Sequence, residues 1–131
     1  MAGFDASLTI TGIQEAQQAN LRAIAALRPE GAFGRAVVYA ATAAHRYAVA
    51  ITHVWWYKGG GLRASHRIEV QGLRARIYID PASVNPRGER PAVYGVEEHA
   101  RGGSHAFYER VVVERGREIA EGAMRELVRG L

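Results

Sequence analysis

Residues 67–80 carry two runs in which apolar and polar side chains alternate, and this pattern constrains the fold more than any other feature of the chain. Ile68 and Val70 alternate with charged or amide side chains in the first run. The apolar members of the second run are Leu73, Ala75, Ile77 and Ile79. A period of two is typical of a β-strand with one face on the core and the other toward water. Gly72 separates the runs and favours a tight turn, so we expect an antiparallel hairpin.

Helical periodicity dominates much of the remaining chain. Apolar residues recur at spacings of three and four in three segments, which predicts amphipathic helices over about 13–28, from about residue 34 to 58, and over 105–131. Pro29 is expected to end the first helix, and Gly59–Gly61 is expected to end the second. The many alanines of the second helix favour helix formation and let a neighbouring helix approach closely.

Shorter elements are predicted around these helices. Residues 7–11 alternate between apolar and hydroxyl side chains, which indicates a short strand. Residues 81–91 are expected to form a projecting loop, residues 92–96 a short strand, and residues 99–104 a second loop. The predicted order is β-α-α-β-β-(β)-α. We therefore expect a single α+β domain over 1–131, in which a small antiparallel β-sheet is packed by three amphipathic helices.

Composition and motifs exclude several classes of site. The 131 residues suit one domain, and the chain contains no cysteine, so disulfides, thiolate zinc sites and cysteine nucleophiles are excluded. The N-terminus shows no basic region followed by an apolar run, so we expect no signal peptide, and the apolar stretches are too polar to span a membrane. The sequence has no nucleophile elbow, zinc-protease, phosphate-loop or dinucleotide-binding motif. We therefore expect neither enzyme activity nor a cofactor.

Histidines are the residues of this chain most suited to metal binding or proton transfer. His45 and His53 lie about two turns apart on the predicted second helix, too far to share a metal ion without other ligands. His99 and His105 flank a glycine-containing loop, where a metal or acid–base role is an alternative. We expect ordinary structural histidines and no metal site.

The glycine-rich segment Gly59–Gly61 precedes Leu62 and Arg63, and such a segment can bind phosphate through backbone N–H groups. A strand rather than a helix is expected to follow it, so the helix N-terminus that strengthens phosphate sites would be missing. A plain helix-to-strand turn is therefore the favoured interpretation.

Consecutive aromatic residues lie where the second helix is expected to end: Trp55, Trp56 and Tyr57. Consecutive residues on a helix point in different directions, so at least one of them is expected at the surface or in an interface, where aromatic side chains act as anchors. Stacking on nucleic-acid bases and packing of the helix end over the sheet are the alternatives.

Arginine supplies every basic residue except Lys58, and the net charge is +4. Arg67, Arg74 and Arg76 lie on the polar face of the predicted hairpin, although Glu69 dilutes the positive charge there. In a ring-shaped assembly these arginines could line a channel and contact DNA without reading its sequence. A solvated strand face is the alternative interpretation.

The order of the segments carries a family resemblance. A predicted strand that ends at Thr11 leads to an amphipathic helix, and the alanine-rich helix leads into Gly61–Ser65 (Gly-Leu-Arg-Ala-Ser) before two strands. Further along the chain, Tyr94 is followed by Gly-Val-Glu and then Glu98. An Ala-Phe pair that ends at Phe107 lies near the start of the last helix. This order resembles the small neck proteins of long-tailed bacteriophages (siphophages), also described as head–tail joining, tail-completion or minor capsid proteins. Their typical pattern has Thr-Gly-x-Leu-Arg-x-Ser before a strand, Tyr-Ala followed by Glu, and Pro-Phe at the last helix.

The resemblance covers about residues 8–131 and implies a structural virion protein without catalysis. It implies a ring, with a hexamer as one candidate, located between the portal-side connector and the tail tube. The implied partners are further copies of this chain and the connector or stopper, tail terminator or tail-tube proteins, with DNA in the lumen and no membrane. Assembly would take place in the host cytoplasm, and the product would reside in the neck or tail of the virion. Candidate interface residues are then Trp55, Trp56, Tyr57, Leu62, Arg63, Tyr94, Glu98 and Phe107.

Other functions stay open at this stage. The tail terminator of the same tail apparatus shares an α+β build and a hexameric ring, so the sequence does not separate the two roles. A small basic nucleic-acid-binding module is a second alternative, supported by the charge and the aromatic cluster. A small enzyme that uses His99 or His105 is the third.

Overall fold

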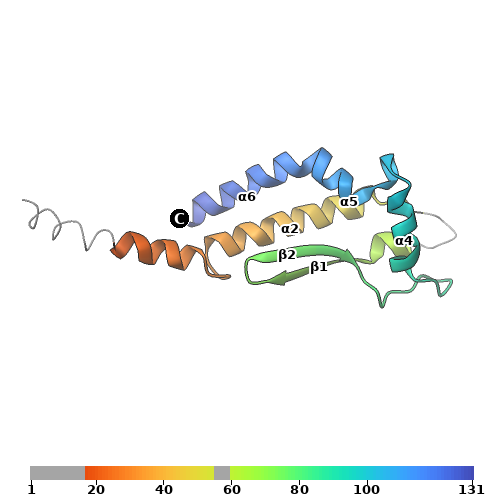
Figure 1. The fold of residues 1–131 in the computed structure, drawn as a ribbon, viewed down its shortest axis with the longest axis horizontal. Helices are drawn as coiled ribbons and strands as arrows, with labels where there is room; N and C mark the ends of the chain where they lie inside the picture. The colour runs from red at the N-terminus through yellow and green to blue at the C-terminus, as the bar shows by residue number, and fades with distance from the viewer. Residues whose placement is uncertain (1–16, 55–59) are drawn as a thin grey trace, which may run out of the picture.

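The long helix α2 (Ala32–Ile51) forms the centre of the molecule. The computed structural model describes residues 17–54 and 60–131. Figure 1 shows a β-hairpin along one side of α2 and the C-terminal helix α6 (Gly116–Gly130) along the other. A helix over residues 17–26 extends from one end of this body, and α4 (Pro91–Ala100) lies across the opposite end. The expected mixture of helices with a small antiparallel sheet is therefore confirmed.

Small residues let α2 approach its neighbours closely. Its buried positions are Ala32, Gly34, Ala41 and Ala48. On the facing helix α6, a Cβ atom added to Gly122 would lie 2.2 Å from the hydroxyl oxygen of Tyr39, so any larger residue would require the Tyr39 side chain to shift. The alanine content noted in the sequence thus serves close helix packing.

The hairpin pairs β1 (His66–Gln71) with β2 (Arg74–Ile79) in antiparallel register, as predicted. Ile68 lies opposite Ile77, and Glu69 lies opposite Arg76, so apolar and polar side chains occupy opposite faces. Gly72 has a φ of +60° in the two-residue turn, a conformation that glycine adopts without strain. Both strands contact α2.

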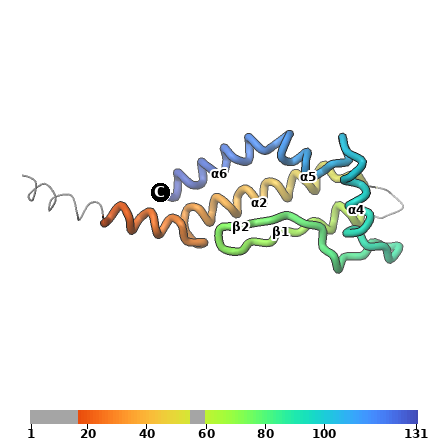
Figure 2. The backbone as a smooth tube through the Cα atoms, in the orientation of Figure 1, coloured from red at the N-terminus to blue at the C-terminus, as the bar shows by residue number. Residues whose placement is uncertain are grey.

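The C-terminal segment is helical nearly throughout, as its periodicity predicts. It consists of α5 (Phe107–Arg110), a π-helical stretch η3 (Val111–Arg115) and α6. The tube in Figure 2 follows this segment along the side of α2 that faces away from the hairpin. Helix α6 makes its main contacts with α2 rather than with the sheet.

The predicted end of the second helix is wrong. Helix α2 stops at Ile51, because Thr52 is extended, with ψ 128°. The backbone N–H and the hydroxyl of Thr52 both donate to the carbonyl oxygen of Ala48, at 3.1 and 2.6 Å, and close the last turn. A short helix, α3 (Gly61–Ala64), then precedes β1, where the sequence analysis expected a strand to follow directly.

The short strand predicted at 92–96 is also wrong, because these residues belong to α4. Pro91 occupies the first turn of this helix, where its fixed φ favours helix formation and its missing N–H costs nothing. The buried residues Pro91, Gly95 and Glu98 follow a helical spacing. The apolar side chains Val93 and Val96, which contributed to the strand prediction, are 64% and 67% exposed.

The loop expected at 81–91 is folded into a turn by Asn85, which is 4% exposed. Its side-chain oxygen accepts the backbone N–H groups of Arg87 and Glu89, each at 2.9 Å. Its backbone N–H donates to the carbonyl oxygen of Glu89 at 2.8 Å. These bonds give the loop a fixed turn, so it projects less freely than expected.

Several predictions lie outside the described residues. These are the strand at 7–11, the start of the first helix, and the aromatic cluster at 55–57. The described part of the first helix ends at residue 26, near the predicted end. Among residues 17–54 and 60–131, every helix is too short or too polar to cross a lipid bilayer.

Candidate functional site

Buried polar side chains gather at the end of the molecule where α2 ends and α4 and α5 meet. Thr52, Ser65, His66 and Glu98 are each at most 3% exposed. Within the described part of the chain, every buried side-chain nitrogen and oxygen has a hydrogen-bond partner. Buried polar groups are costly unless they are paired in this way, so their arrangement decides what this end of the molecule can do.

His66 lies at the start of β1 and is bonded through both ring nitrogens. Its Nε2 lies 2.8 Å from the hydroxyl oxygen of Thr52, and its Nδ1 lies 2.7 Å from the hydroxyl oxygen of Tyr108. Because Thr52 donates its only hydroxyl hydrogen to Ala48, His66 Nε2 must donate to Thr52. Tyr108 then donates to Nδ1, and His66 is the neutral Nε2–H tautomer.

The pKa values of His66 and Tyr108 agree with the geometry of these hydrogen bonds. Burial, followed by the nearby His45 and Arg67, lowers the pKa of His66 to about 4. Burial raises the pKa of Tyr108 to about 12. His66 is therefore neutral near pH 7, and its two ring nitrogens tie the start of β1 to Thr52 at the end of α2 and to Tyr108 on α5.

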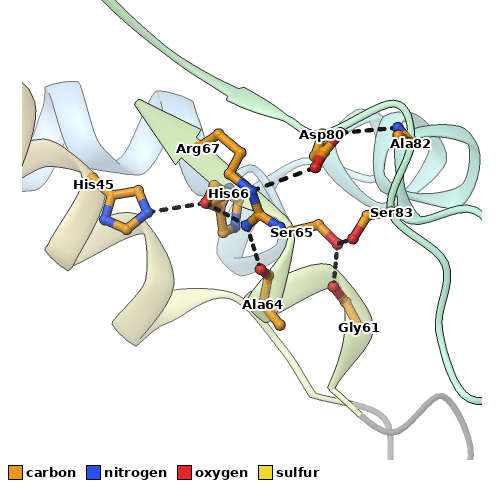
Figure 3. A network of polar contacts seen from close by, with 9 residues as sticks. All are labelled: His45, Gly61, Ala64, Ser65, His66, Arg67, Asp80, Ala82 and Ser83. Atoms are coloured by element: carbon orange, nitrogen blue, oxygen red, sulfur yellow. Dashed lines mark hydrogen bonds and ion pairs between the residues drawn. The ribbon is translucent and has the colours of Figure 1, made fainter. Parts of the chain in front are cut away.

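The segment Ala64–Arg67 ties α2, α3, β1 and the turn after β2 to one another (Figure 3). His45 Nε2 donates to the carbonyl oxygen of His66 at 3.1 Å, and the Ser65 hydroxyl donates to the carbonyl oxygen of Gly61 at 2.5 Å. The side chain of Arg67 donates to the carbonyl oxygen of Ala64 at 2.7 Å and pairs with Asp80 at 3.4 Å. The predicted turn at Gly59–Gly61 is thus followed by a rigid junction.

A second polar cluster contains His53, Glu98 and His105. Glu98 lies on α4 and is 2% exposed, and its Oε1 accepts a hydrogen bond from His105 Nδ1. Its Oε2 lies 3.4 Å from the Arg101 guanidinium. The ring of His53 lies against that of His105, with centroids 4.5 Å apart. One ligand atom from each of His53, Glu98 and His105 lies within 4.8 Å of the other two.

The glycines before His105 explain how it turns back to Glu98. Gly102 and Gly103 have φ values of +72° and +54°, which side chains rarely adopt. A Cβ atom at either position would meet nothing within 4 Å. Backbone conformation, and not space, therefore requires glycine here, and it brings the turn η2 (Gly103–His105) beneath α4.

Aromatic rings fill the space between these clusters. Phe107 is 2% exposed, and its ring packs edge-on against those of His66, His99 and Tyr108, with centroid distances of 5.2, 5.0 and 4.7 Å. Helix α4 packs closely on this side, because a Cβ atom on Gly95 would lie 2.7 Å from Ile79 Cδ1. Phe107 is therefore the apolar centre of this polar end.

Three residues predicted for an interface are buried within the chain itself: Leu62, Glu98 and Phe107, at 3, 2 and 2% exposed. Their prediction as surface contacts is corrected, because contacts distant in sequence cover them. Arg63 is exposed, and its guanidinium donates to the carbonyl oxygen of Thr52 at 2.9 Å. Tyr94 is half-buried, and Trp55–Tyr57 lies outside the described residues.

The arginines predicted to line a channel are partly paired. Arg67 pairs with Asp80, as described above, and Arg76 lies 3.2 Å from Glu69. The Arg76 guanidinium also stacks over the Tyr78 ring at 4.6 Å. Arg74 is exposed near the hairpin turn. These pairs reduce the positive field of the hairpin face.

The grouping of His53 with Glu98 and His105 was not predicted from the sequence. His53 was assigned to a helix with His45, and His105 was considered together with His99. In the structure His99 faces Phe107 instead, and His45 bonds to His66. Only the short spacing between Glu98 and His105 across two glycines is visible in the sequence, and it does not indicate His53.

Apolar surface gathers on other parts of the molecule. Leu21, Ile24 and Leu27 form a stripe on the outward-extending helix, and they are 59, 54 and 51% exposed. We call residues 17–27 the arm and these three side chains the arm stripe. A groove of about 730 Å³ lies between α2, the hairpin and the C-terminal helices. Its lining is mostly apolar and includes Val37, Ala44, Leu73, Ile77, Val112 and Ile119.

Comparisons with known proteins give no further constraint. No protein-family model, curated protein or solved structure matches the chain. Any function assigned to it must therefore rest on its own sequence pattern and geometry.

Proposed function

We propose that this chain is a structural subunit of the neck of a long-tailed bacteriophage, where it forms part of a ring between the head and the tail. The proposal joins the segment order, which resembles that family, to surface features that suit protein contacts. The same features would serve a tail terminator, so the partner that binds the ring distinguishes the two roles.

The observation that carries the proposal is that one chain has two different apolar surfaces, the arm stripe and the groove. The arm extends away from the body (Figure 1), so the arm stripe lies apart from the groove of the same chain. In a ring, each subunit meets its two neighbours through two different surfaces, a heterologous contact that closes. The arm stripe of one copy packs in the groove of the next, which removes both surfaces from water.

The buried polar end fits this structural role. His66 has both ring nitrogens bonded inside the protein. Its lowered pKa keeps it neutral near pH 7. A site of this kind stiffens the subunit, whereas an enzyme needs groups that reach a substrate.

DNA is a secondary partner in this proposal. The exposed hairpin arginines Arg74 and Arg76 also line the groove, beside Glu69, so they would reach DNA only at the part of its rim that the arm stripe of the next copy leaves open. Contacts of this type are made to phosphates and do not depend on base sequence. Binding to DNA would therefore weaken steeply as salt concentration rises.

The decisive experiment measures assembly of the tag-free chain by light scattering after gel filtration and by negative-stain microscopy. We expect rings, either of the chain alone or together with a connector or tail-tube protein. The double variant Leu21→Glu/Ile24→Glu should abolish them, because it places charge on the arm stripe. The matched control Ala19→Glu/Arg22→Gln changes the net charge by the same amount at exposed positions on the opposite side of the arm and should still assemble.

Two results would contradict the proposal. One is a chain that stays monomeric at every concentration, alone and with connector and tail-tube proteins. The other is salt-dependent binding of DNA or RNA by the monomer, which would favour a nucleic-acid-binding module instead. Genes for portal, capsid and tail-tube proteins beside the gene for this chain would support the neck assignment.

A further inference from the structure

The cluster of His53, Glu98 and His105 has the donor atoms of a metal site. Two imidazoles and one carboxylate form a ligand set that Zn²⁺ takes in proteins. We propose that these three side chains bind one divalent transition-metal ion, with Zn²⁺ as the best-suited species. This inference departs from the expectation of no metal site and does not depend on the proposed function.

The distances favour a shared ion. Zinc binds imidazole nitrogen and carboxylate oxygen at about 2.0–2.2 Å, so the ligand atoms of one ion lie roughly 3–4 Å apart. The donor atoms of His53, Glu98 and His105 already lie within 4.8 Å of one another. His53 and His105 are half-buried, and metal binding requires the three donor atoms to close to the spacing of zinc ligands.

The carboxylate is held in a suitable orientation. The side chain of Glu98 is 1% exposed, so its negative charge has little water around it and favours a nearby cation. Its two oxygens have different partners, because Oε1 faces His105 and Oε2 faces Arg101. The Arg101 contact leaves Oε1 for the metal and acts as the outer partner that metal-binding carboxylates usually have.

A simple hydrogen-bonded pair explains only part of the cluster. His105 Nδ1 donates to Glu98, and Arg101 supplies further positive charge, which together satisfy the carboxylate. This pair gives no role to His53, whose ring nevertheless lies against His105. Metal binding uses all three side chains, with the ion replacing the Nδ1 proton, which is released to solvent.

The position of the three ligands gives the ion a structural consequence. His53 follows the end of α2, Glu98 lies on α4, and His105 lies in η2. One ion would therefore join the end of α2 to α4 and η2, which lie much further along the chain. A ligand that binds only the folded state raises its stability with concentration, so zinc should stabilise this end of the molecule. Three protein ligands leave a fourth position to water.

The test uses tag-free protein that has been treated with a chelator and dialysed. Zn²⁺ is titrated by calorimetry and by competition with a chromophoric chelator, and Co²⁺ is added separately to record visible absorption. We expect one ion per chain, a higher melting temperature with Zn²⁺, and the Co²⁺ spectrum of a four-coordinate site. His53→Ala should weaken Zn²⁺ binding at least about 10-fold. Removing even a hydrogen-bond partner of a metal ligand typically weakens metal binding by about 10- to 100-fold, and His53 is itself a proposed ligand.

Two variants make the test specific. His53→Ala leaves the Glu98–His105 hydrogen bond in place, so the protein should stay folded. His99→Asn is the matched control, because His99 neighbours Glu98 in sequence but faces Phe107, and it should bind Zn²⁺ like the unaltered chain. Circular dichroism establishes that each variant is folded.

The inference is overturned if the unaltered chain does not bind Zn²⁺ with a stoichiometry of one. It is also overturned if folded His53→Ala binds Zn²⁺ as tightly as the unaltered chain. Assembly into rings is measured separately, so failure of metal binding leaves the proposed function standing, and the reverse also holds.

Discussion

The two ends of the molecule place their side chains in opposite ways. At the α4 end, Thr52, His66 and Glu98 are polar and at most 3% exposed. On the arm, Leu21, Ile24 and Leu27 are apolar and at least 51% exposed. Polar groups tolerate burial when each finds a partner, whereas exposed apolar side chains that gather in a stripe indicate a contact with another molecule. The α4 end should therefore govern the stability of the subunit, and the arm should govern its assembly.

The strongest test of this difference removes Phe107, the apolar side chain at the centre of the polar α4 end. Phe107→Ala should lower the free energy of unfolding by about 3–5 kcal/mol, because it leaves a cavity among buried rings. Urea denaturation measures this loss. Val113, in the following stretch η3, is 76% exposed, so Val113→Ala should change stability by no more than about 0.5 kcal/mol. Equal losses in the two variants would mean that Phe107 is not a core residue.

A pH titration of stability tests the neutral state of His66. Its folded pKa is about 4 and its ordinary pKa is 6.5, so the unfolded chain binds more protons between these values. The contribution is fully present above pH 6.5 and is lost as the pH falls toward 4. It amounts to about 3 kcal/mol, at 1.36 kcal/mol per pKa unit.

The control for this titration is His66→Asn, which removes the titrating ring. Its stability should fall less steeply between pH 6.5 and 4 than that of the unaltered chain, since other groups titrate in both proteins. Parallel stability curves in that window would show that His66 is readily protonated in the folded state, contrary to its burial.

Removing one hydroxyl group tests the hydrogen-bonded chain at the polar end. Tyr108→Phe leaves His66 Nδ1 without its donor and should cost about 1–3 kcal/mol, the range for an unpaired buried acceptor. Thermal unfolding at pH 7 measures the change. The matched variant Tyr47→Phe removes a bond of 2.8 Å to Glu114 at the surface, and its loss should be smaller. A larger effect for Tyr47→Phe would reverse the assignment of His66 as a structural centre.

The smallest effect on stability is expected from the arm. Leu21→Glu/Ile24→Glu should change the free energy of unfolding of the monomer by no more than about 0.5 kcal/mol per substitution, because both side chains already face water. Denaturation at low protein concentration, where no ring forms, measures this. A large loss would place the arm stripe against the body of its own chain and would remove the basis for the proposed contact between copies.

Local pattern was sufficient for part of the fold. The alternation around Gly72 predicted the hairpin, and the period of the C-terminal segment predicted its helix, because both patterns reflect which face of a single element is buried. The end of α2 could not be predicted in this way. Thr52 closes the helix while bonding to His66, a partner distant in sequence.

The candidate site was the least predictable part. Leu62, Glu98 and Phe107 were expected at an interface, yet contacts from separate elements bury them. Four histidines were considered in two pairs that do not match this cluster, since spacing along the chain does not indicate which side chains meet after α4 crosses the end of α2. The apolar positions of the first helix were predicted, but that helix was expected to pack on the sheet, whereas Leu21, Ile24 and Leu27 are exposed.

The sequence by itself determined the α+β class, the hairpin and its turn, and most of the helical segments, because these depend on local periodicity and on glycine or proline at particular positions. Only the tertiary structure decided that Pro91–Ala100 is a helix, that Phe107 is a core residue, and that His53, Glu98 and His105 lie together. The physical reason is that burial and hydrogen-bond pairing depend on contacts between distant segments, which no local pattern encodes.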